Sequence, residues 1–146
     1  MARNEIHIDA PIATVFDVLA DPRFFANWVV GASSVRGVEG EWPAVGSTLH
    51  HSQQLVLRDT TQVKLVDPPR RLLLEARARP LAVAEVDIGL EPDGDGTRLV
   101  LVERATGAIA GAFPELLTDP LIHIRNRASV ARLKRLAEIG HQLGLD

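Results

Sequence analysis

Two side chains of this sequence could work together in acid–base chemistry: His51 and Glu103. The chain has no cysteine and no tyrosine, so proton transfer must fall to histidine, aspartate, glutamate or a bound water. A carboxylate beside an imidazole can orient and charge it, which would give a general acid or base for enolisation or dehydration. In the alternative interpretation, His51 hydrogen-bonds locally while Glu103 pairs with an arginine at a strand end.

The histidines and aspartates do not have the spacing of metal ligands. His50 and His51 are adjacent, and adjacent residues of a strand point to opposite faces, so they cannot readily share one ion. The run Asp93–Gly96 contains two aspartates, but the remaining ligands of a calcium loop do not follow it. We therefore predict no metal site and no cofactor, and we predict a hairpin turn at Asp93–Gly96.

The N-terminal segment predicts one strand followed by two helices. Apolar and polar residues alternate over residues 6–9, which is typical of a strand. Apolar residues then recur at helical spacing over residues 12–19, so this segment is predicted to be an amphipathic helix. Asp21 followed by Pro22 is typical of a second helix start, and this short helix is predicted to end at Trp28.

The rest of the chain predicts a sheet and one long helix. Six segments have the composition or alternation of strands, namely residues 35–39, 47–57, 60–66, 71–79, 82–91 and 97–104. Their short connections favour antiparallel neighbours in one meandering sheet. Residues 114–143 return to helical spacing with one apolar stripe, and such a helix needs a sheet to cover.

Length and charge limit the class of protein. With 146 residues, of which 46% are apolar and 24% charged, the sequence predicts a single domain over residues 1–146. A formal net charge of −3 argues against a broad surface for nucleic acid or anionic membrane. No apolar run is long enough to span a membrane, and no secretory signal is visible. We therefore expect a cytoplasmic protein without a nucleic-acid partner or membrane span.

Several short motifs occur in a fixed order along the chain: Ala10-Pro11, Val15-Phe16, Asp21-Pro22, Trp28, Val45-Gly46, Asp67-Pro68-Pro69-Arg70, Gly96-Thr97-Arg98 and Asn126-Arg127. With the order of predicted elements, they resemble the START/Bet v 1-like (SRPBCC) superfamily, in its polyketide cyclase/dehydratase-like branch. The resemblance implies an α+β helix-grip fold, in which a seven-stranded antiparallel sheet curves around a long C-terminal helix and two short helices follow strand 1. It also implies a deep apolar cavity between sheet and helix.

Alternation along the strands indicates which side chains would face such a cavity. His51 and Glu103 fall on the apolar side of their strands, which is why they could meet. The other side chains predicted to bind a ligand are Phe16, Trp28, Leu49, Gln53, Leu65, Leu74, Ile88, Leu101, Ile122, Arg125, Asn126 and Ser129. A mostly apolar lining with a few polar groups is typical of a small-molecule pocket.

Three functions follow as hypotheses. The first is binding of a small hydrophobic molecule, such as a polyketide, a lipid or an isoprenoid-like compound, in the cavity. The second is a polyketide cyclase/dehydratase-type enzyme that uses His51 and Glu103, so the sequence leaves open whether the protein is an enzyme. The third is a protein-interaction module resembling co-chaperone or toxin-like relatives. The few polar residues predicted to face inward favour binding, by a monomer or a homodimer.

Overall fold

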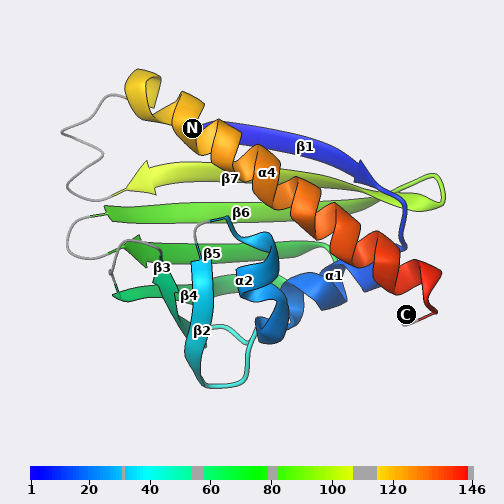
Figure 1. The fold of residues 1–146 in the computed structure, drawn as a ribbon, viewed down its shortest axis with the longest axis horizontal. Helices are drawn as coiled ribbons and strands as arrows, with labels where there is room; N and C mark the ends of the chain where they lie inside the picture. The colour runs from blue at the N-terminus through cyan, green and yellow to red at the C-terminus, as the bar shows by residue number, and fades with distance from the viewer. Residues whose placement is uncertain (31, 54–57, 79–81, 107–114, 145–146) are drawn as a thin grey trace.

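Seven antiparallel strands form one sheet in a computed structural model, which describes residues 1–30, 32–53, 58–78, 82–106 and 115–144 (Figure 1). In chain order the elements are β1 (Ala2–Ile8), α1 (Ile12–Ala20), η1 (Pro22–Phe24), α2 (Phe25–Trp28), β2 (Ala32–Glu39), β3 (Thr48–Gln53), β4 (Arg58–Asp67), β5 (Arg71–Ala78), β6 (Ala82–Asp93), β7 (Gly96–Thr106) and α4 (Glu115–Gln142). The strands lie in the order β1-β7-β6-β5-β4-β3-β2. The predicted helix-grip architecture is therefore confirmed.

The two short helices begin where the sequence predicts. Pro11 is the N-cap of α1, and Ile12 begins the helix. Asp21 caps η1 because its side chain accepts a hydrogen bond from the backbone N–H of Arg23 at 2.9 Å, and Pro22 occupies the first helical position. These signals place Phe25 and Trp28 of α2 on the buried side of the molecule.

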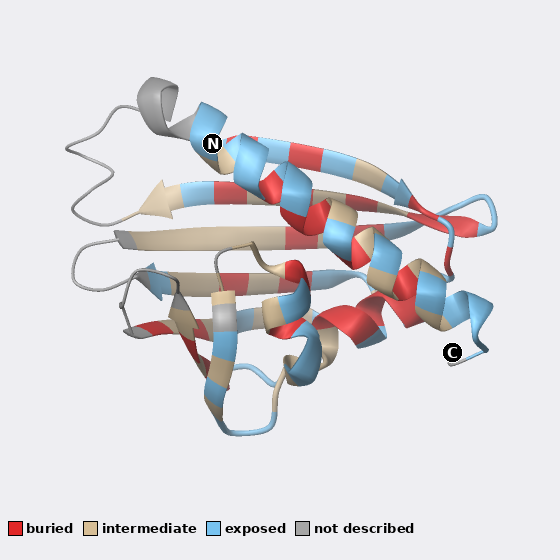
Figure 2. Ribbon diagram, in the orientation of Figure 1, coloured by how far each residue is buried: buried red, intermediate tan, exposed pale blue. Residues whose placement is uncertain are grey.

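The core lies between α4 and the face of the sheet that α4 crosses (Figures 1 and 2). α4 buries Val130, Leu133 and Ala137 almost completely. The facing side chains alternate along the central strands and are Leu72, Leu74, Ile88, Leu90, Leu99 and Leu101. Each fully buried leucine contributes about 2 kcal/mol of hydrophobic stabilisation. This layer fixes the position of α4 over the sheet, and the helix in turn covers one end of the pocket described below.

One predicted orientation is wrong, because β4 contains a β-bulge. Val63 lies opposite Leu74, but Leu65 lies opposite Leu73, so the bulged strand has one extra residue here. The extra residue moves Val66, instead of Leu65, onto the core face, where it packs against the buried cluster. Leu65 is therefore half-buried on the other face of the sheet and is not placed to bind a ligand in the cavity.

The turn between β6 and β7 lies where the sequence predicts it, whereas Arg58 and Asp59, which were expected to form a turn, are paired with β3 as the first residues of β4. The β6–β7 hairpin pairs Asp93 with Gly96, and Gly94 has the positive φ of 61° that this tight turn requires. The last four residues of the predicted 47–57 strand, 54–57, lie outside the described residues. Within the described part of the chain, no helix is both long and apolar enough to cross a membrane.

Candidate functional site

A pocket of about 80 Å³ lies between α2, α4 and the inner face of the sheet. Most of its wall is apolar, and these residues are Phe25, Trp28, Val29, Val30, Leu74, Ala76, Val86 and Leu101. The polar residues of the wall are His51, Thr61, Glu103, Arg125, Asn126 and Ser129. The strands β3 to β7 supply both polar and apolar parts of the wall, because alternate residues of each strand point to the inner face of the sheet.

The acidic side of the pocket is a hydrogen-bonded network between β7 and α4. Glu103 has a side chain only 7% exposed, and it forms an ion pair with Arg125, whose Nη2 donates to Oε1 at 2.6 Å. Asn126 Nδ2 donates to Oε2 of the same carboxylate at 3.2 Å. Arg125 and Asn126 are adjacent on α4, so the helix brings both donors to one buried carboxylate. The charge of Glu103 is thus balanced within the pocket wall.

The opposite side of the pocket contains His51 on β3. Its Nε2 lies 2.9 Å from Oγ1 of Thr61 on β4, and its ring lies 5.0 Å from the ring of Phe25. Burial, with smaller effects of Arg36 and His50, lowers the pKa of His51 to about 4. The imidazole is therefore neutral at pH 7.

The predicted His51–Glu103 pair shares a pocket but forms no hydrogen bond among the described residues. His51 is bonded to Thr61, and Glu103 is bonded to Arg125 and Asn126. This is the alternative arrangement that the sequence also allowed. The two groups can still contact one ligand from opposite sides, because both line the same pocket.

The segment that follows α2 is held against α4 at the pocket by a direct hydrogen bond. The backbone N–H of Val30 donates to Oγ of Ser129 at 3.0 Å. Trp28, at the end of α2, is only 4% exposed and packs edge-on against Phe25, with ring centroids 6.0 Å apart. The short helix therefore presents two aromatic rings to the pocket in a fixed orientation.

The pocket contains six of the twelve predicted ligand-binding residues, namely Trp28, Leu74, Leu101, Arg125, Asn126 and Ser129. Three others are core residues away from this wall: Phe16, Leu49 and Ile88. Ile122 is half-buried one turn before Asn126, and Leu65 faces the other side of the sheet. The side chain of Gln53 lies outside the part that the structure describes. That the six bind a ligand remains a prediction.

Six lining residues are absent from the predicted site residues, although alternation contains a signal for those on the central strands; they are Phe25, Val29, Val30, Thr61, Ala76 and Val86. Thr61 lies two residues before Val63, and Ala76 lies two residues after Leu74, so alternation alone assigns both to the inner face. Phe25 begins α2, which is a single short turn, and its ring lies beside the ring of His51 at the pocket. Such a short helix has no periodicity from which its inward face could be predicted.

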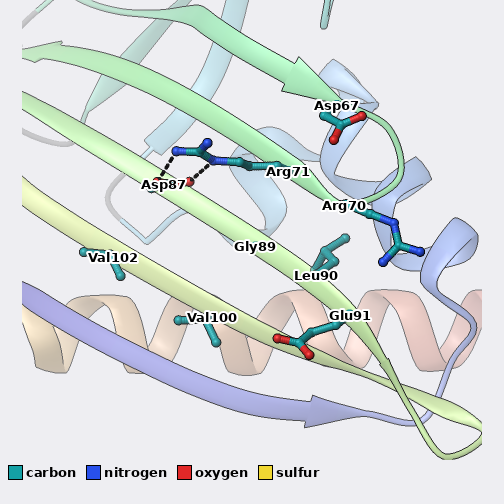
Figure 3. A pocket seen from close by; sticks show the side chains of 9 residues that line it. All are labelled: Asp67, Arg70, Arg71, Asp87, Gly89, Leu90, Glu91, Val100 and Val102. Carbon is teal, nitrogen blue, oxygen red and sulfur yellow. Dashed lines mark hydrogen bonds and ion pairs between the residues drawn. The ribbon is translucent and has the colours of Figure 1, made fainter.

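A second hollow, of about 520 Å³, lies on the opposite face of the sheet (Figure 3). It is open to solvent, and its floor includes Gly89, Val100 and Val102. At its rim Arg71 pairs with Asp87 at 2.8 Å, and both side chains are well exposed. A shallow, exposed groove desolvates a small ligand poorly. The smaller pocket is less open to solvent than this hollow and is therefore the candidate functional site.

Replacement of Arg125 with methionine is expected to destabilise the protein by about 1–3 kcal/mol, because it leaves the buried Glu103 carboxylate without its cation. The cost stays below that of a fully buried pair because the Arg125 side chain is 42% exposed. Urea denaturation at pH 7 measures the change in the free energy of unfolding.

Two further variants make this experiment specific. Arg127→Met removes an exposed arginine from the same turn of α4 and should change the free energy of unfolding by less than about 0.5 kcal/mol. Glu103→Gln in the Arg125→Met background should restore part of the lost stability, since an amide is less costly to bury than an unpaired carboxylate. Equal losses for Arg125→Met and Arg127→Met would contradict the proposed importance of the ion pair.

Solved structures with the same fold are similar to this chain at low sequence identity. Protein NE0264 from Nitrosomonas europaea is 18% identical, with a TM-score of 0.74 and coverage of 96% of this chain and 95% of that one. DynU16, from the dynemicin biosynthetic locus, is 21% identical with a TM-score of 0.71; the match covers 95% of this chain but 47% of DynU16. The Aha1 dimer from Colwellia psychrerythraea is 14% identical with a TM-score of 0.69, covering 95% and 96%. At these identities the similarity shows the fold.

The family is shown by a match to the family as a whole and not by a match to a single protein. A sequence search of curated proteins found no significant match. Residues 2–138, from β1 nearly to the end of α4, match the family described as polyketide cyclase / dehydrase and lipid transport. The match covers both sides of the pocket, including His51 on β3 and the Glu103–Arg125 pair. The chain therefore belongs to the polyketide cyclase/dehydrase and lipid transport family, in agreement with its SRPBCC-like fold.

Proposed function

We propose that the protein binds a small hydrophobic molecule, such as a polyketide, in the pocket between α2, α4 and the sheet. The observation that carries the proposal is a partly enclosed pocket whose wall is mostly apolar and has polar groups at two opposite sides. The family description and the origin of DynU16 in the dynemicin biosynthetic locus support a polyketide-like compound. A lipid or an isoprenoid-like compound presents similar apolar surface and remains within the same proposal.

The volume of the pocket limits how much of a ligand it can enclose. Drug-sized ligands usually occupy pockets of roughly 300–1,000 Å³. The described residues enclose about 80 Å³, which is room for one ring or a short chain. A larger ligand must therefore project past the partly exposed Arg125 or displace part of the wall.

The alternative function, a cyclase or dehydratase, requires His51 to exchange a proton at neutral pH. Its pKa of about 4 makes it a weak base, because an efficient general base has a pKa near the working pH. Protonation of the buried ring costs about 3 kcal/mol more than protonation of a solvated imidazole. These features favour binding over catalysis by His51. Glu103 is already occupied by Arg125 and Asn126.

The third function, a protein-interaction module, stays a prediction. Leu121 and Ile124 are exposed on α4, at 71% and 65%, and lie one turn apart. Two side chains are a small apolar surface compared with the several hundred Å² typical of an interaction site. The dimeric Aha1 structure makes a homodimer a reasonable state to test by light scattering, beside the monomer.

The Ala76→Phe variant is expected to bind apolar ligands at least tenfold more weakly, because a phenyl ring on this wall would fill a pocket of about 80 Å³. The probe is p-xylene, followed by NMR through the methyl resonances of Leu74 and Leu101. Native mass spectrometry of protein purified without detergent, followed by extraction, would identify any bound natural ligand.

The matched control is Val102→Phe, which places the same ring on the opposite face of the sheet. This variant should bind p-xylene like the original protein. Thermal melting of both variants shows that each is folded. Failure of the original protein to bind p-xylene, or equal binding by Ala76→Phe, would overturn the proposed function.

A further inference from the structure

Positive charge is concentrated on one segment of an otherwise acidic chain. Residues 120–137 contain four arginines and one lysine but neither aspartate nor glutamate, although the whole chain has a formal net charge of −3. The charge of the whole chain therefore conceals a local excess of basic side chains on α4. Such an asymmetry is typical of a surface that contacts an anionic partner.

Two of these five basic side chains are neutralised within the fold. Arg125 pairs with Glu103 at the pocket, and Lys134 pairs with the carboxylate one turn further along α4. The other three are exposed, and they are Arg127, Arg132 and Arg135. None of these three forms an ion pair with any residue that the structure describes. Their charges are therefore available to a partner that approaches α4 from solvent.

The three arginines share one side of the helix with large apolar side chains. Leu121, Ile124 and Ile139 are 71%, 65% and 54% exposed. Helical spacing places these residues and the three arginines on the side of α4 that points away from the sheet (Figure 2). We call this side the outer face of α4, and it comprises Leu121, Ile124, Arg127, Arg132, Arg135 and Ile139.

This mixture of guanidinium and aliphatic groups fits the boundary between the headgroups and the acyl chains of a bilayer. Guanidinium groups bind phosphates through paired N–H donors, and exposed aliphatic side chains lose contact with water when they enter the acyl boundary. The outer face has no aromatic side chain on which a nucleic-acid base could stack. It also lies on a convex helix, to which a fluid lipid surface adapts, whereas a protein partner needs a complementary shape.

We propose that the outer face of α4 docks on a membrane surface that contains anionic phospholipids, with its arginines at the phosphates and its aliphatic side chains at the acyl boundary. The inference adds a partner to the proposed binding function and does not depend on it. Asn126 and Ser129 line the pocket from the other side of the same helix. Docking would therefore bring the pocket to within about 10 Å of the lipid, the diameter of one helix.

Co-sedimentation with lipid vesicles tests the proposal. The probes are vesicles of phosphatidylcholine alone and vesicles of phosphatidylcholine and phosphatidylglycerol in equal amounts. We expect the protein to bind the anionic vesicles at least about tenfold more tightly than the neutral ones. Salt at about 1 M should remove most of this difference, because it screens charges beyond about 3 Å.

A triple variant removes the unpaired charges. Arg127→Gln, Arg132→Gln and Arg135→Gln, combined in one protein, should weaken binding to the anionic vesicles at least about tenfold, because each basic side chain near an anionic surface contributes about fivefold in affinity. All three side chains are exposed, so the fold should persist, and thermal melting checks this.

The matched control changes the net charge equally on the other side of the molecule. Arg71→Gln, Arg77→Gln and Arg98→Gln replace three exposed arginines on the outer face of the sheet. This control should bind the anionic vesicles like the original protein. The Leu121→Ser and Ile124→Ser double variant keeps every charge and should weaken binding by about tenfold, because it removes the side chains that enter the acyl boundary.

The outcomes separate this inference from the proposed function. Equal binding of neutral and anionic vesicles, no binding of either, or equal binding by the triple variant and its control would overturn the membrane proposal. Preference for poly-L-glutamate or polyuridylate over the vesicles would assign the outer face to an acidic protein or a nucleic acid, and the proposal would again be wrong. The Ala76→Phe pocket variant should bind anionic vesicles like the original protein, so loss of p-xylene binding leaves this inference standing.

Discussion

Between pH 6.5 and pH 4, the free energy of unfolding is expected to fall by about 3 kcal/mol less in the His51→Gln variant than in the original protein. The folded protein holds the pKa of His51 at about 4, chiefly because the ring is buried, whereas the unfolded chain has a histidine pKa near 6.5. Between these values the unfolded state binds the additional proton, so the free energy of unfolding falls as the pH falls. Urea denaturation at several pH values measures this slope in both proteins.

His7 provides a control of opposite sign. Hydrogen bonds to Asp93 and Asp9, both at 2.9 Å, raise the pKa of His7 above its usual value. Its contribution to stability is present below pH 6.5 and is lost as the pH rises through the raised pKa. The His7→Gln variant should therefore be less stable than the original protein below pH 6.5, and this difference should disappear as the pH rises through the raised pKa of His7. The His51→Gln variant should instead lose less stability than the original protein as the pH falls below 6.5. Parallel pH profiles for His51→Gln and the original protein would show that His51 is not buried in its neutral form.

Substitution of Gly96 by alanine is expected to cost about 2–4 kcal/mol of stability. A Cβ atom at this position would lie 2.4 Å from the carbonyl oxygen of Ile8 and 2.7 Å from Cε1 of His7. The oxygen belongs to the backbone of β1, which is paired with β7 at the adjacent residues, so it cannot move away alone. The free energy of unfolding in urea measures the effect.

Gly89 is the matched control for this substitution. It lies within β6, and a Cβ atom there would meet nothing within 4 Å. Gly89→Ala should therefore leave stability unchanged or raise it by a few tenths of a kcal/mol, since alanine has less conformational freedom in the unfolded chain. Similar losses for the two variants would contradict the close approach of β1 to β7 at Gly96.

Periodicity predicted most of the fold, because each element has a strong local signal. The Asp21-Pro22 start, the hairpin at Asp93–Gly96 and the apolar stripe of α4 all depend on neighbouring residues. The bulge in β4 has no such signal, since β4 itself contains neither glycine nor proline. One extra residue is enough to reverse the two faces of a strand.

The sequence predicted which face of the sheet carries His51 and Glu103, but it did not predict their hydrogen-bond partners. Alternation placed His51 and Glu103 on the inner faces of β3 and β7, where the structure also has them. Which groups they bond to depends on the register between β3 and β4, and on the rotation of α4 over the sheet. Both are set by tertiary packing, so the bonds to Thr61 and Arg125 could not be derived from spacing along the chain.

Burial is unequal along α4 (Figure 2), and this inequality predicts which part of the helix opens first. Residues 123–125 are exposed, whereas Val130, Leu133 and Ala137 are buried against the sheet and α1. Segments with few buried contacts open locally at a lower free energy than the whole fold unfolds. Asn126 and Ser129 lie at the boundary, so we expect the exposed turn to open locally at a lower free energy than the segment around Leu133. Amide hydrogen exchange along α4 would follow this gradient, with protection rising from the pocket toward the C-terminal half of the helix.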